Sequence, residues 1–162
     1  MIPTFEMSER VLCIPAESAE SYLPFDIVST ADHVFIPRSL CEYDESMRQV
    51  IPYIAIQALD GRYLVYDRRG SEDRLHGFSS IGVGGHVQEG ESLWSGTDRE
   101  LMEEVGITIG GSHKRKNLGT IILHDTPVSR VHIGVAMRFT VAACTPKQEL
   151  LNARWMFLDA IR

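Results

Sequence analysis

Residues 85–107 read GHVQEGESLWSGTDRELMEEVGI, and this stretch predicts a glycine-rich loop that leads into one amphipathic helix. Ser92 is of the residue type that favours a helix N-cap, and Gly106 follows the last apolar residue, as a C-cap does. The pattern therefore predicts a helix over about residues 93–105. Within that helix, the absence of a side chain at Gly96 predicts either room for a close neighbour or a tolerated weak position.

Three carboxylates fall on one side of this helix. At about 100° per residue, Glu100, Glu103 and Glu104 lie within an arc of roughly 100°. Like charges at this spacing repel one another by a few tenths of a kcal/mol (about 0.2–0.5 per pair), so a solvated acidic face is one interpretation. A hard divalent cation with oxygen ligands offsets the same repulsion, and Mg²⁺ also binds substrate phosphates. The glycines, Arg99 and Glu91 stand at fixed spacings from these glutamates, and this favours the metal site over a solvated face.

The spacing of the whole stretch matches the pattern G-x5-E-x7-R-E-U-x-E-E-x-G-U, in which U is a bulky apolar residue. The nine matching positions are Gly85, Glu91, Arg99, Glu100, Leu101, Glu103, Glu104, Gly106 and Ile107. The segment therefore resembles the box of the Nudix hydrolases, enzymes that cleave nucleoside diphosphates linked to another group. This resemblance implies an α/β fold, an α/β/α sandwich with a mixed β-sheet in which the box forms a loop–helix–loop motif.

The same resemblance implies roles for individual residues. Glu100, Glu103 and Glu104 would bind Mg²⁺ (or Mn²⁺) together with the backbone carbonyl of Gly84. Arg99 would pair with Glu91 across the loop and orient Glu100. The metal-activated water would then attack a phosphorus of the diphosphate. The general base stays open between Glu100, Glu103 and a glutamate outside the box.

Outside the box, residues 49–56 and 62–69 flank Asp60-Gly61 and predict a β-hairpin. With residues 74–82, they resemble a little-characterised bacterial MutT-like group described as predicted phosphoesterases. Residues 49–162 are expected to form the Nudix domain, and residues 1–48 an extension packed on it. That extension, in which 10–14 and 33–36 predict short strands and 16–22 a helical turn or two, would complete the core, cover the substrate or contact a second copy.

Further phosphate and metal contacts are predicted less sharply. Arg68, Arg69, Arg74 and His76 precede the glycine-rich loop, where they are either phosphate ligands or members of a charged loop. Glu149 and Asp125 are the candidates for an additional carboxylate. Residues 108–117 predict a basic loop, and residues 118–124 and 131–142 predict strands, the second of which places His132 and Arg138 on one face. Residues 154–159 predict a late strand.

Length, net charge and cysteine content limit the kinds of protein that this chain can be. A chain of 162 residues fits one domain, and its net charge of −6 makes a nucleic acid partner unlikely. No apolar run approaches the roughly 20 residues that span a bilayer, so no membrane segment is expected. Cys13, Cys41 and Cys144 are few and widely spaced, which is typical of a cytoplasmic protein with reduced thiols. A homodimer is expected from the resemblance alone.

The sequence therefore predicts a Mg²⁺- or Mn²⁺-dependent pyrophosphohydrolase that acts on a small nucleotide and cleaves an acid anhydride. One alternative is a Nudix binding module that senses a nucleotide without turnover. A second is an isomerase of the isopentenyl-diphosphate type, and a third is an RNA 5′-end pyrophosphohydrolase. The intact carboxylate set disfavours the first alternative, and the acidic balance disfavours the last.

Overall fold

The computed structural model describes residues 9–21, 33–67, 79–106, 114–142 and 150–161, and its sheet is organised around strand β3 (Met47–Ala58). This strand alternates buried and half-buried side chains over most of its length, with Val50, Ile54 and Ile56 wholly buried. β-branched residues of this kind suit a pleated strand that packs against a core. At the far end, Gly61 has a φ of +93° and closes the predicted turn into β4 (Tyr63–Asp67). The predicted hairpin is confirmed.

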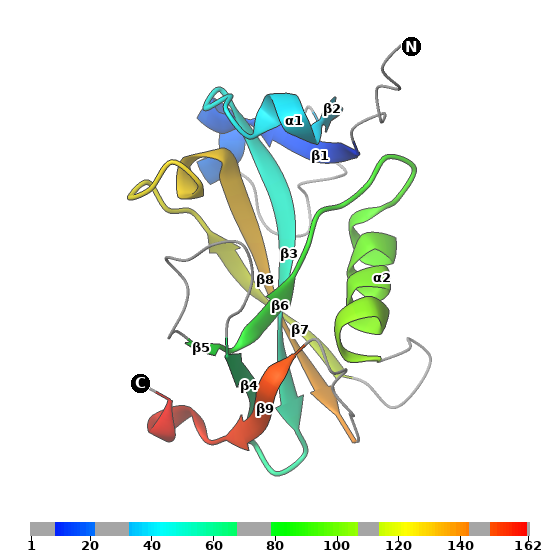
Figure 1. The fold of residues 1–162 in the computed structure, drawn as a ribbon, viewed down its shortest axis with the longest axis vertical. Helices are drawn as coiled ribbons and strands as arrows, with labels where there is room; N and C mark the ends of the chain where they lie inside the picture. Colours follow the sequence, from blue (N-terminus) through cyan, green and yellow to red (C-terminus); the bar gives the residue numbers. More distant parts are fainter. Residues whose placement is uncertain (1–8, 22–32, 68–78, 107–113, 143–149, 162) are drawn as a thin grey trace, which may run out of the picture. The chain divides into compact units, whose positions relative to one another are not determined.

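The strands form a nine-stranded sheet with the order β2-β1-β3-β4-β5. In addition, β6 and β8 pair with β3, β7 pairs with β8, and β9 pairs with β4. The remaining strands are β1 (Arg10–Pro15), β2 (Val34–Pro37), β5 (Ser79–Ser80), β6 (Gly82–Gly84), β7 (Lys114–Ile121), β8 (His132–Val141) and β9 (Leu151–Met156). The helical segments are η1 (Ala16–Ser21), α1 (Arg38–Cys41), α2 (Leu93–Val105), η3 (Ser129–Val131) and η4 (Leu158–Ala160). β1, β4 and β6 pair antiparallel with β3, whereas β8 pairs with β3 and runs in the same direction (Figure 1). The predicted α/β class with a mixed sheet is confirmed.

The chain forms two compact units, each assembled from three separate segments. Unit 1 comprises Met1–Pro52, His86–Gly96 and Gly119–Val135, and unit 2 comprises Tyr53–Gly85, Thr97–Leu118 and Ala136–Arg162. Each unit has its own buried apolar side chains: Leu12, Ile14 and Ile133 lie in unit 1, and Leu64, Leu101 and Phe139 lie in unit 2.

In unit 1, the described part of residues 1–48 is built into the sheet. β1 pairs with β3 through Cys13↔Gln49, Ile14↔Arg48 and Pro15↔Met47. All four residues from Val11 to Ile14 are buried, and β1 pairs with β2 as well as with β3. The predicted strands at 10–14 and 33–36 and the helical turns after Pro15 are confirmed as β1, β2 and η1.

Two thiols lie in a small buried cluster of unit 1, where Cys13, Cys41 and Val11 pack together with Ile36 and Met47 beside them. Burial raises the pKa of the Cys13 thiol to about 12 from an ordinary value of 9.0, and the neighbouring Cys41 thiol adds to the rise. The folded protein therefore holds this proton more tightly than the unfolded chain does between about pH 9 and 12, so this group's contribution to stability is lost as pH rises through that window. We expect the free energy of unfolding, measured with urea, to fall more steeply from pH 9 to 10.5 in the wild-type protein than in Cys13→Ala. Equal slopes would contradict this origin of the pH dependence.

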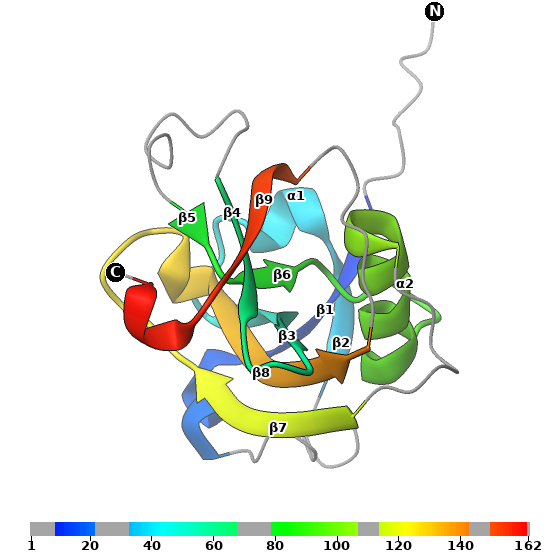
Figure 2. The ribbon, with the colours of Figure 1, turned by 90° about the horizontal axis from the view of Figure 1, so that it is seen from below.

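The basic loop predicted for residues 108–117 is wrong at its end, since Lys114 to Asn117 belong to β7. Residues 107–113 lie outside the described residues. β7 pairs with β8, and it lies along β8 in Figure 2. Lys114, Arg115 and Lys116 are exposed, and charged side chains of this kind are what edge strands carry against unwanted pairing. The start of this edge strand is as polar in composition as a surface loop, so the sequence alone predicted a loop there.

Among the described helices, none is long and apolar enough to cross a membrane.

Candidate functional site

Helix α2 begins and ends where its terminal residues predict. The Ser95 backbone N–H donates to Ser92 Oγ at 3.0 Å, and the Ser92 N–H donates to Ser95 Oγ at 2.8 Å. These two bonds satisfy donors at the helix N-terminus in the manner of a capping box. At the other end Gly106 has a φ of +73°, and its N–H donates to the Met102 carbonyl at 3.1 Å. The predicted helix is confirmed.

In unit 2, the carboxylate of Glu100 lies directly against the backbone of Gly85. Glu100 is only 8% exposed. A Cβ built on Gly85 would overlap the Glu100 carboxyl carbon and both of its oxygens. A glycine is therefore needed at this position for the carboxylate to approach the loop.

Arg99 holds two carboxylates of the same helix. Its Nη1 donates to Glu100 Oε1 at 2.9 Å and to Glu103 Oε2 at 3.2 Å. Burial raises the pKa of the Glu100 carboxyl above its ordinary value, Arg99 opposes that rise, and the charges of Glu103 and Glu104 add to it. Arg99 therefore contacts Glu100, and its role in orienting that carboxylate stays a prediction. Its pairing with Glu91 stays a prediction.

In unit 1, Glu91 organises the loop that precedes the helix. Its Oε2 accepts a hydrogen bond from the Gln88 N–H at 3.0 Å. A Cβ on Gly96 would lie 3.0 Å from the same oxygen and 3.3 Å from a Val87 methyl group. Gly96 thus makes room for a close neighbour, as one of the two interpretations of the sequence proposed.

The donor atoms of the carboxylate face suit a hard cation. Carboxylate and carbonyl oxygens are the ligands that Mg²⁺ and Mn²⁺ prefer, and the Glu100 carboxylate lies against the backbone of Gly85 in the loop. Within the described residues, no three carboxylate, imidazole or thiol groups are gathered closely enough to form a metal site. Arg99 is bonded to both Glu100 and Glu103 in this arrangement, so metal binding would require their carboxylates to turn from it.

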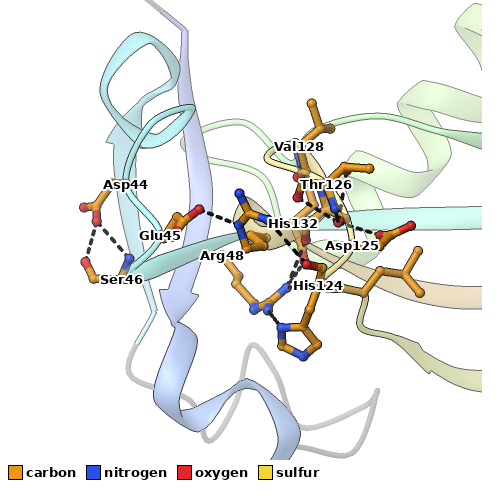
Figure 3. A network of polar contacts seen from close by, with 12 residues as sticks. Asp44, Glu45, Ser46, Arg48, His124, Asp125, Thr126, Val128 and His132 are labelled. Atoms are coloured by element: carbon orange, nitrogen blue, oxygen red, sulfur yellow. Dashed lines mark hydrogen bonds and ion pairs between the residues drawn. The ribbon is translucent and has the colours of Figure 1, made fainter. Parts of the chain in front are cut away.

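The other predicted site residues are placed less favourably or not at all. Arg68, Arg69, Arg74, His76 and Glu149 lie outside the described residues. Asp125 lies in unit 1, in the loop before η3, where its Oδ1 accepts from Ser129 Oγ at 2.9 Å. This bond is part of the turn that Asp125, Thr126 and Ser129 form together (Figure 3).

The structure reveals a buried arginine that the sequence did not single out. Arg48 is 4% exposed and lies beneath the same loop, as Figure 3 shows. Its Nη1 donates to the carbonyls of Leu123, Ser129 and His132 at 3.4, 3.0 and 2.8 Å. Its Nη2 donates to His124 Nδ1 at 3.1 Å, which requires that nitrogen to be unprotonated. The only signal in the sequence is a polar pair, Arg48-Gln49, at the start of an apolar strand.

Gln49, next to Arg48, is fully buried and fixes a histidine of the box. Its Nε2 donates to the Cys41 carbonyl at 3.4 Å, so its Oε1 accepts from His86 Nε2 at 2.7 Å. The His86 and His132 rings lie 5.8 Å apart, and His132 Nδ1 donates to the Val128 carbonyl at 2.6 Å. His86 immediately follows Gly85 in the chain, so this bond anchors the start of the box within unit 1.

A model of the NUDIX domain matches residues 47–161. The chain belongs to the NUDIX family.

The chain also resembles individual proteins over part of its length. The chain is 34% identical over 138 residues to Protein YmaB of Bacillus subtilis, a match that covers 77% of this chain and 66% of that protein. It is also 34% identical over 80 residues to the oxidized purine nucleoside triphosphate hydrolase of Mus musculus, covering 49% of this chain and 50% of that enzyme. The chain therefore spans less than two thirds of the length of either relative.

A solved structure agrees with the fold. The crystal structure of Tm1382, named as a candidate Nudix hydrolase, superposes with a TM-score of 0.73 at 26% identity. The match covers 93% of this chain and 87% of that one, so it includes described segments outside the matched NUDIX domain.

Proposed function

We propose that this NUDIX chain is a pyrophosphohydrolase that cleaves a nucleoside diphosphate linked to another group. The observation that carries this proposal is the buried Glu100 carboxylate, which lies against Gly85 and is held by Arg99 at 2.9 Å. A solvated acidic helix face does not need to bury a carboxylate, since charged groups lose hydration when they are buried. The intact box and the family membership support a catalytic rather than a solvated face.

We propose that Glu100, Glu103 and Glu104, with the carbonyl of Gly84, bind Mg²⁺ or Mn²⁺. A cation bound there lowers the pKa of a water ligand and neutralises charge on phosphoryl oxygens. The chain's own residues have separate tasks. Arg99 positions Glu100, and Gly85 leaves space for the carboxylate. Arg68, Arg69, Arg74 and His76 are proposed as phosphate contacts, and Glu149 or Asp125 as an additional carboxylate.

The substrate is proposed as a small nucleotide. The mouse relative bears the name of an oxidized purine nucleoside triphosphate hydrolase, which supports including such triphosphates among the candidates. ADP-ribose, a nucleotide sugar and a dinucleoside polyphosphate also contain a phosphoanhydride bond, and they are the other three candidate substrate classes. A homodimer is also proposed.

The experiment that tests hydrolysis is a panel of these four compound classes, with isopentenyl diphosphate added, assayed with Mg²⁺ in water enriched in ¹⁸O. Product analysis by ³¹P NMR and mass spectrometry is expected to show two phosphorus-containing products from one class, one of them carrying a single ¹⁸O. Tight binding of a nucleotide without any cleavage would contradict hydrolysis and favour a sensor. Isomerisation of isopentenyl diphosphate without ¹⁸O uptake would favour the isomerase.

Gly85→Ala is expected to reduce activity with little change in stability. The new Cβ would overlap the Glu100 carboxylate, which is the end of a flexible side chain and can move away. A catalytic group displaced by about 1 Å can cost roughly 100-fold in rate, so we expect kcat to fall by about 10- to 100-fold. Thermal melting should change by only a few degrees (roughly the effect of 1 kcal/mol or less).

Gly82→Ala is the matched control for Gly85→Ala. Its Cβ would overlap the Tyr53 ring, whose hydroxyl accepts from the Gly82 N–H at 3.1 Å and which cannot swing aside as a carboxylate does. This substitution should cost about 1–3 kcal/mol of stability. If Gly85→Ala destabilises the protein as much as Gly82→Ala does and retains the wild-type kcat per folded molecule, the proposed role of Gly85 is wrong.

A further inference from the structure

Arg138 lies on the half-buried face of β8. The residues Ile133, Val135, Met137, Phe139 and Val141 are buried, and those between them, Arg138 included, are half-buried. The predicted common face of His132 and Arg138 therefore agrees with the burial pattern of the strand. Within unit 2, this face continues onto β3, because Thr140 Oγ1 donates to Gln57 Oε1 at 3.2 Å.

On β3 and β8, the described neighbours of Arg138 on this face carry no negative charge. Side chains on one face of a strand recur every two residues. Two residues before Thr140 and Gln57, this face carries Arg138 on β8 and Ala55 on β3. Tyr53, two residues before Ala55 on the same face, is uncharged, and its hydroxyl accepts a hydrogen bond from the Gly82 N–H. The guanidinium is thus partly removed from water without a carboxylate beside it on these two strands.

Arg138 differs in this respect from the other arginines that the structure describes in unit 2. Each of the other four has a carboxylate partner: Arg62 pairs with Asp60 at 2.7 Å, Arg99 with Glu100 at 2.9 Å, Arg115 with Asp98 at 3.9 Å and Arg154 with Asp67 at 3.0 Å. No described residue gives Arg138 a hydrogen bond or an ion pair, and its Nε is buried without an acceptor.

An unsatisfied buried donor on a charged group is unfavourable, and native proteins rarely keep one without a use for it. Four of the five described arginines in this unit pair with a carboxylate of the chain. The partner of the fifth is then expected to come from outside the described residues and to be anionic. The planar guanidinium binds phosphoryl oxygens through two parallel hydrogen bonds, which a half-buried setting strengthens.

We propose that Arg138 binds a phosphoryl group of the substrate and so contributes to substrate selection. This inference rests on the proposed function, because the phosphoryl group is taken to belong to the nucleotide that is cleaved. Arg138, Gly85 and Glu100 all belong to unit 2, so the proposed phosphoryl contact lies in the same compact unit as the Glu100 carboxylate. The geometry assigns to Arg138 a binding role and no part in moving a proton.

The test measures binding of α,β-methylene-ADP, whose methylene bridge replaces the cleavable oxygen, by isothermal titration calorimetry with Mg²⁺. The proteins are the wild type, Arg138→Gln, Arg138→Lys and the control Arg62→Gln, which removes an exposed ion pair from the same unit. We expect Kd to rise about tenfold or more in Arg138→Gln, as the loss of a charge-assisted contact predicts, and by less in Arg138→Lys. Arg62→Gln should bind like the wild type. Unchanged Kd in Arg138→Gln, or no binding by the wild type, overturns the proposal.

Thermal melting separates a binding role from a structural one. Because Arg138 makes no bond to any described residue, Arg138→Gln should melt at the wild-type temperature or above it. A lower melting temperature with an unchanged Kd identifies a structural arginine and overturns the inference. If α,β-methylene-ADP binds through Arg138 but no compound of the panel is cleaved, the proposed function fails and the binding site stands. If a compound is cleaved and Arg138→Gln keeps the wild-type Kd and KM, the Arg138 proposal fails alone.

Discussion

Glu103→Gln and Glu104→Gln are each expected to lower kcat by about 10²–10³-fold on the substrate that the panel identifies. Glutamine has nearly the shape of glutamate but no negative charge, so the substitution weakens a metal ligand while it leaves the helix surface almost unchanged. Both side chains lie on α2, whose caps and buried Leu101 do not depend on them. The measurement is steady-state hydrolysis with saturating Mg²⁺, with the folded fraction checked by circular dichroism.

Glu89→Gln is the matched control for these two substitutions. Glu89 lies within the same matched stretch, and its carboxylate forms an ion pair with Arg10 at 2.9 Å on the surface of unit 1. An exposed pair of this kind contributes little, about 0–1 kcal/mol, so kcat should stay within a factor of two or so of the wild type. Similar losses in all three variants would mean that the general negative charge, and not a specific ligand set, supports activity.

Arg48→Met is expected to destabilise the protein by about 2–4 kcal/mol. The substitution keeps an unbranched apolar stem but removes every hydrogen bond from Arg48 to the loop before β8. The carbonyls of Ser129 and His132 would then lose donors at 3.0 and 2.8 Å beside a buried site. Urea unfolding followed by circular dichroism measures the loss.

Arg62→Met serves as the control for Arg48→Met, since Arg62 is exposed and pairs with Asp60 across a tight turn. Its substitution should change stability by no more than about 0.5 kcal/mol. If Arg48→Met also stays within that range, the loop is held by other contacts and Arg48 is not its anchor.

The local features of the site could be predicted from the sequence because they depend on residues close together in the chain. Ser92 and Ser95 satisfy each other within one helical turn, and Gly106 ends the helix by its own backbone conformation. The arc of carboxylates follows from the helical repeat alone. The close approach of Glu100 to Gly85 also involves only 15 residues of separation, but the sequence analysis did not predict it.

Contacts between distant segments could not be predicted in this way. Arg48 reaches carbonyls that are 75 to 84 residues away in sequence, and a lone arginine at the start of a strand does not identify such partners. The residues Lys114 to Lys116 were expected in a loop because an exposed edge strand and a basic loop have the same polar composition. For Arg138, the strand alternation predicted the face, but only the structure shows that no carboxylate of the described residues pairs with it.

The central claim is that the carboxylates of α2 bind the metal that hydrolysis needs. It is tested most directly by measuring Mn²⁺ occupancy by electron paramagnetic resonance and the initial rate of substrate cleavage in the same samples. In the wild type the rate should be absent without metal and should rise in proportion to occupancy, and Glu104→Gln should bind Mn²⁺ at least about tenfold more weakly. Cleavage that persists after complete metal removal, or a Glu104→Gln variant with the occupancy and rate of the wild type, would contradict the claim.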